Sequence, residues 1–81
     1  DVYGMLPEIE VPTLLIAGAN EHQTILRSLV SYQRLMPVCT ARTVPQMGHA
    51  WCNQDPALFA KTVTCWASGA PLPHELSAID A

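Results

Sequence analysis

The chain has 81 residues, of which 49% are hydrophobic and 14% charged, and its formal net charge at pH 7 is −3. This composition excludes an intrinsically disordered chain, and the length allows one small domain or part of one. We expect no nucleic-acid partner, because the few basic residues are scattered and form no phosphate-binding face. They are Arg27, Arg34, Arg42 and Lys61.

Membrane and targeting signals are absent from the sequence. No apolar run approaches the roughly 20 residues of a membrane-spanning helix, and no basic segment followed by an apolar one stands at the amino end. The sequence therefore predicts a soluble, cytoplasmic protein with no membrane partner. The chain starts at Asp1 and passes through Gly4 and Pro7 directly toward an apolar segment, which favours a fragment of a longer protein.

Three cysteines, at positions 39, 52 and 65, make an odd number with irregular spacing. Without a CxxC pair or a disulfide-rich pattern, they favour a reducing compartment and small buried thiols. The alternative is a metal site, but the spacing of its candidate ligands matches no known pattern. These candidates are His49, Cys52, Cys65 and His74. We therefore expect no metal and no cofactor.

The first predicted elements are an approach segment over residues 1–10 and a strand over residues 11–17. The strand is a short, continuous apolar run that begins with Pro12 in its first positions and is closed by Gly18. Such a run is typical of a strand buried on both faces of a parallel sheet. Proline is tolerated there because a missing donor does least harm at the start of a strand.

A helix is predicted over residues 22–36, because its apolar residues recur at the three-and-four spacing of one helical face. They are Ile25, Leu26, Leu29, Val30, Leu35 and Met36. Pro37 ends the helix, and Asn20 followed by Gln23 resembles a capping box. Glu21 would then be a carboxylate near the positive end of the helix dipole, a structural role that is compatible with a catalytic one.

Residues 41–44 predict a second strand, and the loop after it carries Pro45 and Gly48 immediately before His49. Asp55 as N-cap and Pro56 in the first turn then predict a helix over residues 56–67. Its predicted buried face consists of Leu58, Phe59, Val63 and Trp66. Large rings contribute burial first, so the two tryptophans, at positions 51 and 66, are expected in the core or in a pocket wall.

Ser68 and Gly69 followed by Pro71 predict the end of this last helix. Residues 70–81 are predicted to form a tail, in which His74 and Glu75 are solvated.

The order strand, helix, strand, helix predicts two parallel strands joined by a right-handed crossover. Parallel strands present their carboxyl ends at one edge of the sheet, where open α/β sheets place their sites. The loop with Glu21 and the loop with His49 should therefore emerge on the same side. An imidazole held there can accept and return a proton, and a carboxylate beside it can orient the ring.

Five segments carry a recognisable pattern, namely residues 12–21, 35–37, 44–51, 53–59 and 66–73. Their order and spacing resemble the carboxyl-terminal third of the α/β-hydrolase family. In that family a Gly-x-x-Asp/Glu loop after the penultimate core strand carries the triad acid, and a Gly-His step after the last strand carries the triad base. Glu21 matches the first motif and His49 the second.

The resemblance implies an α/β fold, with residues 1–81 as a single partial domain that forms a βαβα portion of a parallel sheet. It also implies that the complete protein is a serine hydrolase, acting on an ester or related bond of a small-molecule substrate. Glu21 and His49 would supply the acid and the base of its triad.

The family's nucleophile lies in a Gly-x-Ser-x-Gly turn, and no such turn occurs in these 81 residues. The oxyanion-hole donors also belong to earlier segments of such a fold. The chain's own serines fall in predicted helices, at a helix end or in the tail, at Ser28, Ser31, Ser68 and Ser77. We therefore expect the isolated chain to be inactive.

A strand that is buried on both faces needs a cover, so we expect self-association or binding to the missing amino-terminal part of the fold. The alternative to the hydrolase hypothesis is a non-catalytic α/β folding or interaction module. In that case His49 and Glu21 are structural residues only.

Overall fold

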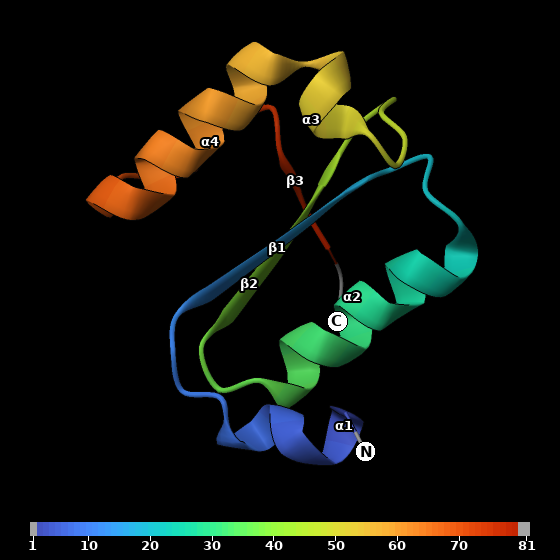
Figure 1. Cartoon of the computed structure of the whole chain (residues 1–81), viewed down its shortest axis with the longest axis vertical. Helices are drawn as coiled ribbons and strands as arrows, with labels where there is room; N and C mark the ends of the chain where they lie inside the picture. The colour runs from blue at the N-terminus through green and yellow to red at the C-terminus, as the bar shows by residue number, and fades with distance from the viewer. Residues whose placement is uncertain (1, 80–81) are drawn as a thin grey trace.

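The structure is a computed structural model, in which residues 2–79 are described. In chain order, the elements are α1 (Val2–Met5), the 3-10 helix η1 (Leu6–Glu8), β1 (Thr13–Gly18), α2 (Gln23–Leu35), β2 (Cys39–Val44), α3 (Trp51–Gln54), α4 (Pro56–Ser68) and β3 (Ser77–Ala78). They form a small mixed α/β fold around a three-stranded sheet of order β1-β2-β3. The helices α2 and α4 lie on opposite sides of the strands (Figure 1). None of the helices in the described range is long and apolar enough to cross a bilayer.

The strands β1 and β2 are parallel, as the sequence predicted, with Thr13 aligned to Cys39 and Gly18 aligned to Val44. Successive side chains of a strand point to opposite faces of the sheet. Leu15 of β1 and Ala41 of β2 point toward α2. Ile16 of β1 and Val44 of β2 point toward α4. The carboxyl ends of β1 and β2 therefore lie side by side.

A small apolar core lies between α2 and the sheet. Ala17, Leu29 and Ala41 are buried together, and the half-buried residues Leu15, Leu26 and Ile79 pack against them. Alanine at the sheet positions lets the helix approach closely, and Leu29 lies at the centre of the apolar stripe predicted for α2.

The start of α2 differs from the predicted capping box. Its N-cap is His22, whose Nδ1 accepts a hydrogen bond from the backbone N–H of Thr24 at 3.1 Å. Asn20 lies in the preceding loop and its backbone N–H donates to the carbonyl of Met47 at 2.9 Å. The capping-box prediction is wrong because residues before His22 are held by contacts with the neighbouring loop, so the helix begins later.

On the α4 face, the buried core consists of Val44, Trp51, Leu58 and Leu76. The helix begins as predicted, with Asp55 accepting a hydrogen bond from the backbone N–H of Leu58 at 3.1 Å. It ends at Gly69, whose φ of 74° lies in the left-handed region that favours glycine.

The predicted buried face of α4 is only partly correct. Its buried stripe passes through Leu58 and Thr62, and the Thr62 hydroxyl donates to the Leu58 carbonyl at 2.7 Å, so a polar side chain fits the core. Phe59 and Val63 were predicted to be buried, but they are 43% and 50% exposed. They lie beside the contact with the sheet, because α4 turns the Leu58–Thr62 row toward the core.

The predicted tail is part of the fold. Ser77 and Ala78 form β3, which pairs antiparallel with Thr43 and Arg42 of β2. Leu76 just before it is buried in the α4-face core. A strand of two residues is too short to show a periodic pattern in the sequence, which explains why β3 was missed. His74 is exposed, as predicted.

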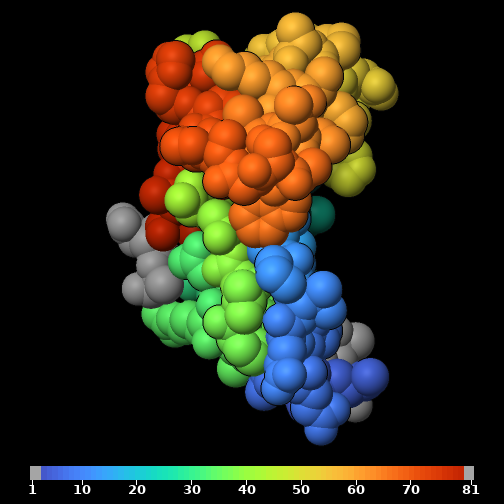
Figure 2. Space-filling view, turned by 90° about the vertical axis from the view of Figure 1, so that its left-hand side faces the viewer, coloured from blue at the N-terminus to red at the C-terminus, as the bar shows by residue number. Residues whose placement is uncertain are grey.

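The strand β1 is less buried than its sequence predicts. Leu14, Leu15 and Ile16 are only half-buried, and just Ala17 and Gly18 are buried fully. Since the sheet order places β1 at the end, no strand lies beside its outer edge within residues 2–79. Figure 2 shows α4 over the upper part of this face, with the blue and green atoms that lead into β1 and β2 uncovered below.

Candidate functional site

The loops that follow β1 and β2 are joined through their backbones. The N–H of Ala19 donates to the carbonyl of Val44, and the N–H of Asn20 donates to the carbonyl of Met47, both at 2.9 Å. The second loop turns sharply at Gln46, whose φ is 65°. These backbone bonds hold the two loops together without any contribution from side chains.

Gly18 is required where the two loops meet. A Cβ atom at this position would collide with the backbone carbonyl groups of Met47 and Gly48. Because these atoms belong to backbone, they have little freedom to move aside. The glycine predicted to end the strand therefore permits the close approach of the loops.

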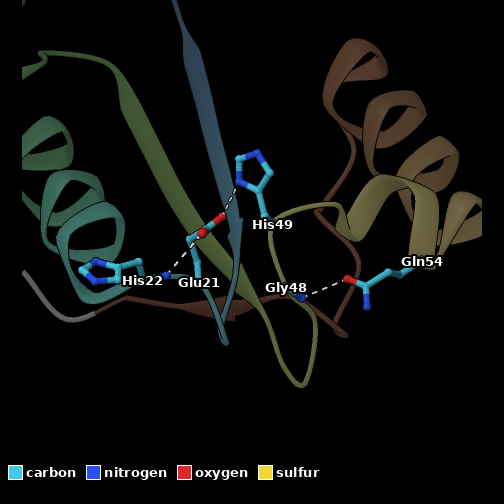
Figure 3. Close-up of polar contacts among 5 residues, drawn as sticks. All are labelled: Glu21, His22, Gly48, His49 and Gln54. Atoms are coloured by element: carbon cyan, nitrogen blue, oxygen red, sulfur yellow. Dashed lines mark hydrogen bonds and ion pairs between the residues drawn. The ribbon is translucent and has the colours of Figure 1, made fainter.

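This approach brings Glu21 and His49 into contact. The Nδ1 atom of His49 lies 2.7 Å from Oε2 of Glu21, a short distance typical of a charge-assisted hydrogen bond. The two residues are 28 positions apart in the sequence but lie on adjacent loops, as the parallel-strand argument predicted. Figure 3 shows the second ring nitrogen of His49 pointing away from the carboxylate.

The two side chains differ in their access to solvent. The side chain of Glu21 is only 12% exposed, whereas that of His49 is 85% exposed. The carboxylate therefore lies in the base of the site and the imidazole projects from it. An arrangement of this kind can orient the ring and leave Nε2 open to an approaching molecule.

Hydrogen bonding favours the ionised form of Glu21. The bond with the His49 side chain is the largest cause and lowers the pKa of the Glu21 carboxyl from its ordinary value. Desolvation raises this pKa in part. The backbone N–H of His22, which donates to Glu21 at 3.2 Å, lowers it. An ionised carboxylate only accepts hydrogen bonds, so Nδ1 of His49 carries the hydrogen in this contact, and Nε2 points away from the carboxylate.

The His49 loop is supported from behind by Gln54, a residue that sequence reasoning missed. Its Oε1 accepts a hydrogen bond from the backbone N–H of Gly48 at 2.9 Å (Figure 3). Gln54 belongs to α3, the single turn of helix that follows the loop. A glutamine six residues after a glycine gives no pattern on its own, so only the fold identifies this contact.

An apolar cavity of about 340 Å³ lies between β1 and α4. Its lining residues are Leu14, Ile16, Trp51, Phe59, Thr62, Val63 and Trp66. The prediction that both tryptophans lie in the core or in a pocket wall is confirmed, since Trp51 is buried and both line this cavity. Trp51 meets Phe59 edge to face, with ring centroids 5.5 Å apart.

The remaining candidates do not converge on this site. Among residues 2–79, no three His, Cys, Asp or Glu side chains gather as metal ligands, and the three cysteines are free. Burial raises the pKa of the Cys39 thiol. Two serine hydroxyls are engaged within helices: Ser28 donates to Thr24 and Ser68 donates to Cys65.

We compared the chain with protein-family models, curated proteins and solved structures. None of the three comparisons gives a match. The functional assignment therefore depends on the geometry of the site and on the sequence pattern.

Proposed function

We propose that this chain supplies the acid and the base of a serine hydrolase of the α/β-hydrolase type, which acts on an ester or related bond of a small molecule. The observation that carries the proposal is the 2.7 Å contact between His49 and Glu21 on adjacent loops after two parallel strands. A carboxylate bound to one imidazole nitrogen, with the other nitrogen open, is the acid–base half of a catalytic triad.

The two side chains have distinct roles in this proposal. Glu21 accepts the Nδ1 hydrogen of His49, which fixes the tautomer and ring orientation and stabilises the imidazolium that forms during turnover. His49 takes a proton from the nucleophile at Nε2 and returns it to the leaving group. The 85% exposure of the His49 side chain is compatible with a nucleophile that approaches from outside the described residues.

The nucleophile is proposed to lie on another segment of the complete protein. In residues 2–79, no hydroxyl or thiol side chain forms a hydrogen bond with His49, and Ser28 and Ser68 are bonded to helix carbonyls. The chain by itself is therefore proposed to be inactive. It should neither hydrolyse simple aryl esters above background nor react with a serine-directed phosphonate.

The complete gene product gives the test. The coding sequence before these residues should encode a Gly-x-Ser-x-Gly turn, and a serine-directed phosphonate should label that serine. His49→Ala should remove the labelling and lower turnover at least ~10⁴-fold, because base and nucleophile act as a unit. His74→Ala is the matched control, since His74 is an exposed histidine outside the site and its loss should leave turnover unchanged.

Two outcomes would reject the proposal. One is a gene without such a turn, and the other is a His49→Ala enzyme with a near-normal rate. Either result would favour the non-catalytic module, in which the Glu21–His49 contact only holds two loops together.

A further inference from the structure

We propose that Gln54 is a positioning residue for His49, which holds the backbone on both sides of the histidine and so keeps its imidazole on Glu21. The inference rests on the proposed function, because Gln54 matters to turnover only if His49 is the base of a hydrolase. The positioning itself can be measured on the chain without any turnover. Gln54 touches neither a substrate nor a reacting atom in this proposal and acts only through His49.

Two hydrogen bonds of Gln54 enclose His49. Its side-chain Oε1 accepts a hydrogen bond from the backbone N–H of Gly48 at 2.9 Å, and its own backbone N–H donates to the carbonyl of Ala50 at 3.0 Å. Gly48 directly precedes the histidine and Ala50 directly follows it. Residues 48–50 are therefore held at both ends by one residue, and Figure 3 shows Gln54 reaching this loop from α3.

Gln54 can hold the loop because it is itself fixed in the fold. It is the last residue of α3, whose first residue, Trp51, is 7% exposed and belongs to the core on the α4 face. The next residue, Asp55, donates its backbone N–H to the carbonyl of Trp51 at 2.8 Å and accepts a hydrogen bond from the N–H of Leu58 at the start of α4. The Gln54 side chain therefore ties the loop to α4 and its core.

The loop has few other restraints around His49. Within residues 2–79, the backbone of His49 makes no hydrogen bond of its own, and its side chain is 85% exposed, so little packing surrounds the ring. The backbone bond at the Met47 carbonyl lies two residues before the histidine. The direction of the imidazole therefore depends on the contact with Glu21 at Nδ1 and on the flanking bonds of Gln54.

The acceptor at position 54 can be removed, shortened or replaced. Gln54→Ala removes it, and Gln54→Asn keeps an amide that is shorter by one methylene group, so its oxygen does not reach Gly48. Gln54→Glu places a carboxylate oxygen at the same distance along the side chain, and this oxygen can accept the same bond. Glycine has more conformational freedom than any other residue, so the backbone before His49 gains freedom when the Gly48 N–H loses its acceptor.

A bond that only stabilises the fold would have different consequences. Its loss would lower the free energy of unfolding, but the pKa of Glu21 would not change. A positioning bond acts on the contact between Glu21 and His49, and the hydrogen bond from His49 is the largest cause of the lowered pKa of Glu21. The titration of Glu21 therefore separates the two roles.

The first measurement is NMR on the 81-residue chain. In Gln54→Ala we expect the Gly48 amide hydrogen to exchange at least ~10-fold faster, and the pKa of Glu21 to rise by at least about a third of its rise in His49→Ala. Gln54→Asn should give the same two changes. Asn53→Ala, which removes a neighbouring exposed amide side chain, should give neither. An unchanged pKa of Glu21 in both Gln54 variants would overturn the proposal.

The second measurement is turnover by the complete protein. Gln54→Ala should lower kcat at least ~10-fold and leave KM within about twofold, because the base is displaced whereas substrate binding is not. Gln54→Glu should return kcat to within about threefold of the unmodified protein, and Asn53→Ala should leave it unchanged. If His49→Ala is inactive but Gln54→Ala is fully active, the positioning role is wrong and the proposed function stands. If His49→Ala is fully active, the proposed function is rejected, and the titration of Glu21 alone decides the positioning role.

Discussion

The junction of the two loops and the outer edge of β1 lie at opposite extremes of packing in this molecule. At the junction, backbone bonds from Ala19 and Asn20 join the loops, and Gly18 leaves no room for a methyl group. At the edge, Leu14 and Ile16 are half-buried, and within residues 2–79 no strand lies on the side of β1 that faces away from β2. The residues that hold Glu21 and His49 are thus fixed by contacts within the described residues, whereas the outer edge of β1 has no strand beside it there.

The loop junction and the outer edge of β1 differ in this way although one segment of the sequence contributes to both. The same apolar run forms the strand that leads to Glu21 and the open edge of the described sheet. A change at Gly18 acts on the junction, and a change on α4 acts on the edge. Single substitutions can therefore affect one region without the other.

The largest effect is expected for Gly18→Ala. The added methyl group would meet the carbonyls of Met47 and Gly48, so the loops must separate or the strands must shift. We expect a loss of about 3 kcal/mol or more in the free energy of unfolding, measured by urea denaturation. The Glu21–His49 contact should be lost as well.

Gly48→Ala is the control for this substitution. A Cβ atom there would lie 3.7 Å from Oε1 of Gln54, an ordinary contact. Its unfolding free energy should remain within about 1 kcal/mol of the unmodified chain. Similar losses in the two variants would show that the junction is less tightly packed than described.

The segment before β3 gives the next largest effect. Leu76 is buried against Val44, Trp51 and Leu58, so Leu76→Ala should lower the unfolding free energy by about 2–4 kcal/mol. Leu35→Ala is the matched control, because Leu35 is 39% exposed at the end of α2 and should lose clearly less. Equal losses would mean that the carboxyl-terminal segment is not packed on the sheet.

The open side of α4 should contribute little to the stability of the fold. Val63→Ala should lower the unfolding free energy by less than about 1 kcal/mol, since Val63 is already 50% exposed. Leu58→Ala on the same helix removes a buried side chain and should cost about 2–4 kcal/mol. If the loss in Val63→Ala equals that in Leu58→Ala, Val63 belongs to the core.

The parts of the fold that follow from local rules could be predicted from the sequence. The continuous apolar run marked β1, Asp55 and Pro56 marked the start of α4, and Gly69 marked its end. The proximity of Glu21 and His49 followed from strand order, because parallel neighbours place their following loops together.

The errors arise where tertiary contacts override local patterns. Asn20 fits a capping box, but its backbone binds Met47 and His22 takes the N-cap. Phe59 and Val63 fit the apolar spacing of α4, yet the helix turns Thr62 toward the sheet. Its hydroxyl can be buried there because it donates to the Leu58 carbonyl within the helix. Neither the rotation of a helix about its axis nor the contact of two loops is specified by spacing along one segment.

The smallest effect concerns the titration of Glu21. The hydrogen bond from His49 is the largest cause of the lowered pKa of Glu21, so His49→Ala should raise this pKa, because desolvation, the next largest cause, acts in the same upward direction. Because the folded-state pKa lies below the unfolded one, the contact stabilises the fold above the unfolded pKa, and this contribution is lost as the pH falls through the folded pKa. NMR titration of the Glu21 carboxyl measures the shift, with His74→Ala as the control that should leave it unchanged. An identical titration in the His49→Ala chain would show that the contact does not persist in solution, and the proposed acid–base pair would lose its structural basis.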